Sequence, residues 1–150
     1  MQAIMKFHRA TLAFAFTALT GLCLASTHAA PTATIQKVST AETPKAYRMD
    51  AARYIYASYP DRIYKGKLPP LVHAIVVAEV VVDGAGGVKH INMIRVPTHA
   101  PDVTASVQKM IHAVSPLPAP SRMGGATFTE IWLVDKSGRF QLDALTEGQR

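Results

Sequence analysis

Four of the six histidines lie beyond the apolar N-terminal stretch, and histidine is the side chain best suited to bind metals and move protons near neutral pH. HxxxH or HxH spacing would present two rings to one ion. None of these four, His73, His90, His99 and His112, has such a partner. We therefore predict scattered surface or half-buried histidines, with no metal site and no cofactor. A spatial cluster of these rings is the arrangement that would favour an enzyme.

The other groups with catalytic potential are isolated acids and serines. Glu79 and Glu130 each stand alone in apolar segments, and a position at a strand end facing water explains them more simply than a buried catalytic acid. Ser115 and Ser121 lie among prolines and lack the glycine-flanked pattern of a nucleophile elbow. We predict that the chain is not an enzyme.

A basic loop is the remaining cluster of charge. Arg62, Lys65 and Lys67 lie in a proline-rich stretch beside Tyr59 and Tyr64. Solvated loop charges are the simplest interpretation. An anion-binding patch for lipid or cell-wall polymers is the alternative.

The N-terminal residues 1–29 are predicted to be a signal peptide. Lys6 and Arg9 precede an apolar run over residues 10–25, and small residues lead to a cleavage site after Ala29. An uncleaved membrane anchor is the open alternative. Cleavage would remove the single Cys of the chain, which suits an oxidising compartment.

The net charge of +6 over 150 residues first suggests nucleic acid as a partner. Cleavage would lower this charge by two, and an exported protein meets little nucleic acid, so we exclude that partner. The length allows one domain.

Residues 30–45 are rich in Thr, Ala and Pro and are predicted to form a flexible lead. Helical spacing of apolar residues then predicts helices over residues 45–58 and 102–114. The polar residues 143–150 are predicted to fray as a tail.

Residues 71–96 give the strongest strand signal. Residues 71–83 are dense in β-branched side chains, residues 84–87 are mostly glycine, and residues 88–96 alternate again, which predicts a β-hairpin. The glycine turn leads into a strand, so it is not a phosphate-binding loop. Residues 126–135 predict a third strand, and residues 139–142 a short fourth one.

These elements predict an α+β fold: a small antiparallel three-stranded sheet, with the short fourth strand left open, and two helices on one face.

The order of these elements resembles the C-terminal domain of the TonB family, the periplasmic energy transducers of Gram-negative bacteria. Tyr59-Pro60 follows the first helix, Asp83-Gly84 begins the hairpin turn, and Pro116-Leu117-Pro118 follows the second helix. The strand over residues 128–134 completes the match. We assign residues 46–142 to this TonB-like domain.

The resemblance implies a protein without enzymatic activity that binds an extended segment of an outer-membrane receptor by strand addition. The segment would lie beside the last long strand, because an exposed edge offers unpaired backbone N–H and C=O groups. The partner-binding residues that the resemblance implies are Tyr59, Pro60, Thr127, Phe128, Thr129, Glu130, Ile131 and Trp132. An open alternative is that residues 139–142 cover this edge.

We therefore expect a periplasmic protein-binding module, linked to energised outer-membrane transport. The alternatives are a TonB-type transducer with a single inner-membrane span, a homodimer that uses the same edge, and a small periplasmic enzyme.

Overall fold

The computed structural model describes residues 37–148. The predicted signal peptide, residues 1–29, lies outside the described residues. Between residues 37 and 148 no helix has the length and apolar character needed to span a bilayer.

The described residues form two helices, two short 3-10 turns and six strands. In chain order these are β1 (Val38–Ser39), α1 (Pro44–Ser58), η1 (Pro60–Arg62), β2 (Ala74–Asp83), β3 (Val88–Arg95), α2 (Pro101–Ala113), β4 (Ala119–Pro120), β5 (Gly125–Val134), β6 (Phe140–Leu142) and η2 (Asp143–Leu145).

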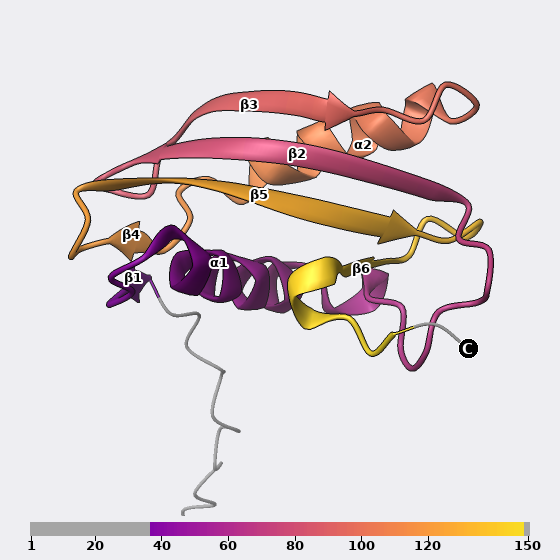
Figure 1. The fold of residues 1–150 in the computed structure, drawn as a ribbon, viewed down its shortest axis with the longest axis horizontal. Helices are drawn as coiled ribbons and strands as arrows, with labels where there is room; N and C mark the ends of the chain where they lie inside the picture. The colour runs from indigo at the N-terminus through magenta and orange to yellow at the C-terminus, as the bar shows by residue number, and fades with distance from the viewer. Residues whose placement is uncertain (1–36, 149–150) are drawn as a thin grey trace, which may run out of the picture. The chain divides into compact units, whose positions relative to one another are not determined.

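Four of these strands form one antiparallel sheet in the order β3-β2-β5-β6 (Figure 1). The predicted α+β class is confirmed, and the short fourth strand is present as β6. β1 and β4 form a second, parallel two-stranded sheet that the sequence did not predict.

The main sheet is buried on one face. Along β2 the residues alternate between buried and half-buried, and Val76 and Val80 are among the buried ones, as the alternation predicted. Phe128 and Trp132 of β5 pair with these two residues and are buried with them. The alternation follows from the strand period of two.

Both helices lie on this buried face (Figure 1). α1 packs on β5, and α2 packs on β2 and β3. α1 begins at Pro44 because Thr43 is its N-cap: the Thr43 hydroxyl accepts the N–H of Ala46 at 3.2 Å. Tyr47, Ile55, Val107 and Ile111 are buried, so each helix contributes one apolar stripe to the core.

The glycine turn of the β2–β3 hairpin is confirmed, and it has a second role. Gly86 has a φ of +86°, and its C=O accepts the N–H of Leu117 at 2.9 Å. A Cβ atom at Gly86 would lie 1.9 Å from the Leu117 carbonyl oxygen. Only glycine therefore allows the turn to pack against the segment that follows α2.

The predicted flexible lead is wrong at its C-terminal end. β1 lies within it, and Ser39 is buried and donates its hydroxyl to the Asp50 carboxylate at 2.7 Å. Two strand residues bounded by polar ones show no periodicity, so β1 could not be recognised from the sequence.

The predicted fraying of the tail is also wrong for its described part. η2 begins at Asp143, and the C=O of Gly148 accepts the N–H of Leu68 at 3.0 Å. Ala144 and Leu145 also pack against the core. The polar residues around them are held by hydrogen bonds, which composition does not reveal.

Candidate functional site

β5 is the strand on which the predicted site depends, and its outer edge is only partly covered. β6 pairs with Trp132, Leu133 and Val134, which we call the covered segment. Before Trp132, no strand of the described residues pairs with β5 on this side. Residues 127–130 form what we call the open segment. The alternative that residues 139–142 cover the edge is thus correct for one end of β5.

The direction of the β5 backbone N–H and C=O groups follows from the hydrogen bonds around β6. Asp135 N–H donates to the Arg139 carbonyl at 2.9 Å, while the Phe140 carbonyl accepts from Tyr64 N–H on the opposite side at 2.9 Å. Backbone groups alternate along a strand. Gln141 therefore faces β5, where it lies opposite Leu133. By the same alternation, Thr127, Thr129 and Ile131 also direct their backbone groups toward this outer edge.

The outer side of β6 is itself occupied by the chain. Ile63 forms a parallel bridge with Phe140, and the Tyr56 hydroxyl accepts the N–H of Leu142 at 3.1 Å. The buried Gln141 amide donates to the carbonyls of Tyr64 at 2.9 Å and of Gly66 at 2.7 Å. A guest strand therefore finds no free edge on β6.

A cluster of charged side chains around the buried Glu130 marks the boundary between the two segments. Arg48 of α1 contacts Glu130 at 2.7 Å and Asp143 of η2 at 2.8 Å, and Glu130 is 1% exposed. The hydrogen bond to Glu130 raises the pKa of the Arg48 guanidinium above its usual value. Glu130 also accepts the N–H of Ile131 at 2.9 Å, so this edge donor is already occupied.

The open segment lies beside a hollow. A groove of about 250 Å³ is lined by residues of α1, β2 and β5: Pro44, Lys45, Arg48, Glu79, Thr127, Phe128 and Thr129. Thr127 and Thr129 are exposed, and Lys45 is exposed and forms no ion pair with a described residue. Backbone groups that face outward here have both space and a nearby positive charge.

The opposite border of the sheet is less suited to a guest strand. β3 pairs only with β2 among the described residues, and its register shifts twice. Arg95 and Met93 pair with consecutive residues of β2, as do His90 and Val88, so Ile94 and Lys89 are extra residues in β3. Bulges and charged residues are devices that hinder strand addition at an edge.

The predicted partner-binding residues do not all gather at one place. Tyr59 lies beside the covered end, since its ring is 6.4 Å from that of Phe140 and its hydroxyl donates to the Met110 carbonyl at 3.0 Å. Pro60 lines a different cavity, with Arg139. Tyr59-Pro60 therefore lies at the covered end of β5 and away from the open segment, because α1 places its C-terminal end there (Figure 1).

The predicted residues of β5 itself divide by side-chain direction. Phe128, Glu130 and Trp132 are buried on the helix side, whereas Thr127 and Thr129 face solvent and Ile131 is half-buried. The sequence favours a position of Glu130 at a strand end facing water. That prediction is wrong, because the Glu130 carboxylate is buried and pairs with Arg48. Phe128, Glu130 and Trp132 contribute packing and charge beneath the edge.

The basic residues Arg62, Lys65 and Lys67 are all exposed, and the structure places them on a loop that is tied to β6. Arg62 donates to the Gly138 carbonyl at 3.0 Å, which joins this loop to the β5–β6 turn.

Two of the four histidines do come together. The rings of His73 and His99 are 5.6 Å apart, and His99 Nε2 is 2.7 Å from the His73 carbonyl oxygen. They line a surface cavity of about 360 Å³ with Arg95. The expectation of four scattered rings is wrong for this pair. Across residues 37–148 no group of three or more His, Cys, Asp or Glu side chains could hold a metal ion.

Three residues of this region were not predicted from the sequence. Arg48 pairs with Glu130 at the boundary, Lys45 lines the groove, and Gln141 ties β6 to the loop after η1. A sequence signal existed only for Glu130. An acid at an inward position of an apolar strand needs a cation, and Arg48 lies on the helix predicted to pack there.

Comparison of the chain with protein-family models, with curated proteins and with solved structures finds no match.

Proposed function

We propose that this chain is an exported protein-binding module, similar to the TonB C-terminal domain, that captures an extended segment of a partner protein. The segment would add as a strand to the open segment of β5. The observation that carries this proposal is the juxtaposition of outward-facing backbone groups at Thr127 and Thr129 with the groove beside them. Main-chain hydrogen bonds would supply the affinity.

The order of elements supports the resemblance. A helix, a hairpin, a second helix and a third long strand follow one another, and the third strand lies beside the first. The predicted signal peptide supports export to the periplasm, and the link with outer-membrane transport rests on the resemblance to the TonB family. Retention of that segment as an inner-membrane anchor, as in an energy transducer, is the alternative.

The open segment limits the length of the partner segment that can bind and favours an acidic one. Thr127 and Thr129 offer outward backbone groups, and Glu130 occupies the next donor at Ile131. A guest of about five residues would therefore pair here before it met η2. Lys45 lines the helix side of the groove and forms no ion pair with a described residue, so an acidic guest side chain on that side is favoured.

The test compares two substitutions at one position. Thr129→Pro removes the outward N–H, whereas Thr129→Val keeps it and alters only the side chain. Peptides would first be selected from a displayed library of random seven-residue sequences, and binding would be measured by fluorescence anisotropy. We expect Thr129→Pro to weaken binding about tenfold or more, and Thr129→Val to change it by less than about twofold.

Equal binding by wild type and Thr129→Pro would reject strand addition at this edge. Thermal unfolding of each variant would check that it folds. Lys45→Glu is an independent probe, because Lys45 is exposed and its reversal should weaken acidic peptides without touching the backbone. Hydrogen exchange with bound peptide should show new protection of the Thr127 and Thr129 amides.

A further inference from the structure

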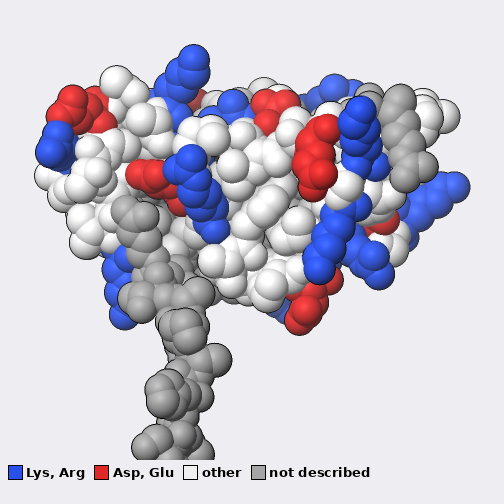
Figure 2. All heavy atoms as spheres, turned by 90° about the horizontal axis from the view of Figure 1, so that it is seen from below, with Lys and Arg blue, Asp and Glu red and all other residues white. Residues whose placement is uncertain are grey.

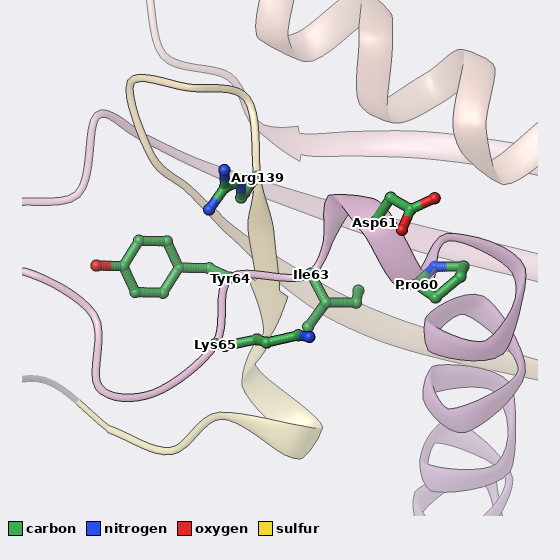
Figure 3. Close-up of a pocket in the computed structure, with 6 residues that line it drawn as sticks. All are labelled: Pro60, Asp61, Ile63, Tyr64, Lys65 and Arg139. Carbon is green, nitrogen blue, oxygen red and sulfur yellow. The ribbon is translucent and has the colours of Figure 1, made fainter.

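A second cavity lies at the covered end of the sheet, away from the groove. It has a volume of about 360 Å³ and is lined by Pro60, Asp61, Ile63, Tyr64, Lys65 and Arg139 (Figure 3). Two chain segments far apart in sequence meet here, the loop after η1 and the turn between β5 and β6. We call this cavity the Arg139 pocket.

The walls of the Arg139 pocket are held in place by hydrogen bonds of the backbone and of side chains. Tyr64 N–H donates to the Phe140 carbonyl at 2.9 Å, and Arg139 N–H donates to the Asp135 carboxylate at 2.9 Å. Arg62 adds a bond of 3.0 Å to the Gly138 carbonyl. The side chains of Lys65 and Arg139 therefore project from fixed positions.

The cations around the pocket are not neutralised by neighbouring acids. The described ion pairs use Arg48, Arg53, Lys89 and Arg122. Five further basic residues lie on the two segments that meet at the pocket, and none of them forms an ion pair with a described residue. They are Arg62, Lys65, Lys67, Lys136 and Arg139. Figure 2 shows several Lys and Arg side chains at this end of the molecule.

The acids near these cations have other roles or directions. The Asp135 carboxylate accepts the N–H groups of Ser137 and Arg139, and the Glu147 carboxylate accepts the N–H of Gly66 at 3.2 Å. Asp61 lines the pocket but points away from Arg139, as Figure 3 shows. The guanidinium of Arg139 and the ammonium of Lys65 thus remain available to an external oxyanion.

We propose that the Arg139 pocket binds an oxyanion, a phosphate or carboxylate group, at the Arg139 guanidinium. Arg supplies a planar pair of donors, and Lys65, whose side chain points to another side of the pocket in Figure 3, adds positive charge at longer range. Tyr64, Pro60 and Ile63 provide apolar surface for the carrier of that group. The oxyanion can come from a lipid headgroup or from a free phosphate. Asp61 points away from Arg139 but lines the pocket, so its negative charge lowers the affinity for an anion.

The test is a titration of the full chain, isotopically labelled, with inorganic phosphate at constant ionic strength, followed by NMR shifts of the Tyr64 and Arg139 amides. We expect saturable shifts in the wild type. Arg139→Gln should weaken phosphate binding about fivefold or more, and Asp61→Asn should tighten it. Lys109→Gln is the matched control, because Lys109 is an exposed cation on α2 without an ion pair to a described residue. It should leave the affinity unchanged.

A second arm measures cosedimentation with phosphatidylglycerol vesicles and with phosphatidylcholine vesicles. Binding to the anionic vesicles that Arg139→Gln weakens and Lys109→Gln does not would support the pocket with a lipid headgroup as its source. Equal loss in Arg139→Gln and Lys109→Gln in both arms would overturn the proposal, because only the overall charge would then matter. Absence of saturable binding in both arms would also overturn it.

Discussion

The open and covered segments of β5 belong to one strand and share one inner partner, β2, yet they meet different surroundings on their outer side. Trp132 in the covered segment has Leu142 opposite it, and its ring lies 4.7 Å from that of Phe140. Thr129 in the open segment has a groove beside it. The difference lies in what the chain supplies after β5, and not in β5 itself.

Covering an edge requires more than three paired residues. β6 is short, but Phe140 and Leu142 are fully buried, and Gln141 joins it to the loop after η1. Burial of the apolar side chains stabilises β6, and the hydrogen bonds give it a fixed register. The open segment has no such apolar cover and no strand hydrogen-bonded to its outer edge among the described residues, so its outward N–H groups stay accessible. A single strand can thus be protected at one end and left available at the other.

The largest expected effect breaks the covered segment. Phe140→Ala removes a ring that packs on Trp132, Tyr56 and Tyr59, and should lower the free energy of unfolding by about 3–5 kcal/mol. Urea unfolding followed by fluorescence of Trp132, the only tryptophan of the chain, would measure it.

The same variant should change hydrogen exchange at the edge. In the wild type we expect the outward amide of Leu133 to exchange slowly and that of Thr129 to exchange fast. Phe140→Ala should move Leu133 toward the rate of Thr129. The Glu130 amide, which faces β2, is the internal control and should remain protected. Equal protection of Leu133 and Thr129 in the wild type would contradict the division of this edge.

The second prediction concerns the boundary. Arg48→Met leaves the buried Glu130 carboxylate without its cation, which should cost about 2–3 kcal/mol, less than for a fully buried pair because Arg48 is partly exposed. Chemical denaturation would measure the loss. The Ile131 amide donates to the Glu130 carboxylate in the wild type, and we expect it to exchange faster in Arg48→Met.

Two further variants separate this effect from loss of any surface charge. Arg122→Met removes an exposed ion pair with Glu42 and should change stability by less than about 1 kcal/mol. The double substitution Arg48→Met with Glu130→Gln should recover part of the loss, because a neutral amide needs no counterion. No recovery in the double variant would show that packing by Arg48, and not its charge, stabilises the boundary.

The sequence predicted the parts of the fold that depend on periodicity. The alternating runs gave the strands β2, β3 and β5, and the helical stripes gave α1 and α2, because apolar burial imposes those repeats. Even the short β6 was marked by its place after a tight turn. β1 escaped because two residues are too few to show a repeat.

The site was harder to predict because it depends on contacts between distant residues. Whether the edge of β5 is open was decided by Ile63 and Tyr56, which hold β6 in place from segments up to 86 residues away, and by Gln141 of β6, which donates to the Tyr64 carbonyl. Polar side chains of this kind carry no periodic signal. The same holds for the pairing of Arg48 with Glu130, which are 82 residues apart.

The smallest expected effect concerns the single hydroxyl that supports β6 from α1. Tyr56→Phe leaves the Leu142 N–H without its acceptor, and should lower the free energy of unfolding by about 1 kcal/mol at pH 8. Tyr54→Phe is the matched control on the same helix, since the Tyr54 hydroxyl bonds no described residue. Its stability should stay close to that of the wild type.

The Tyr56 contribution should also depend on pH. Burial is the main cause that raises the pKa of the Tyr56 phenol. The unfolded chain therefore releases this proton near pH 10, before the folded chain does, and the free energy of unfolding falls as pH rises above about 10. Phe cannot ionise, so the stability gap between wild type and Tyr56→Phe should shrink there. Tyr47 and Tyr59, whose pKa values are also raised by burial, remain in both chains and cancel in this difference. A gap that stays constant from pH 8 to above pH 10 would mean that the Tyr56 hydroxyl is not buried against β6, and the covered segment would then lack one of its supports.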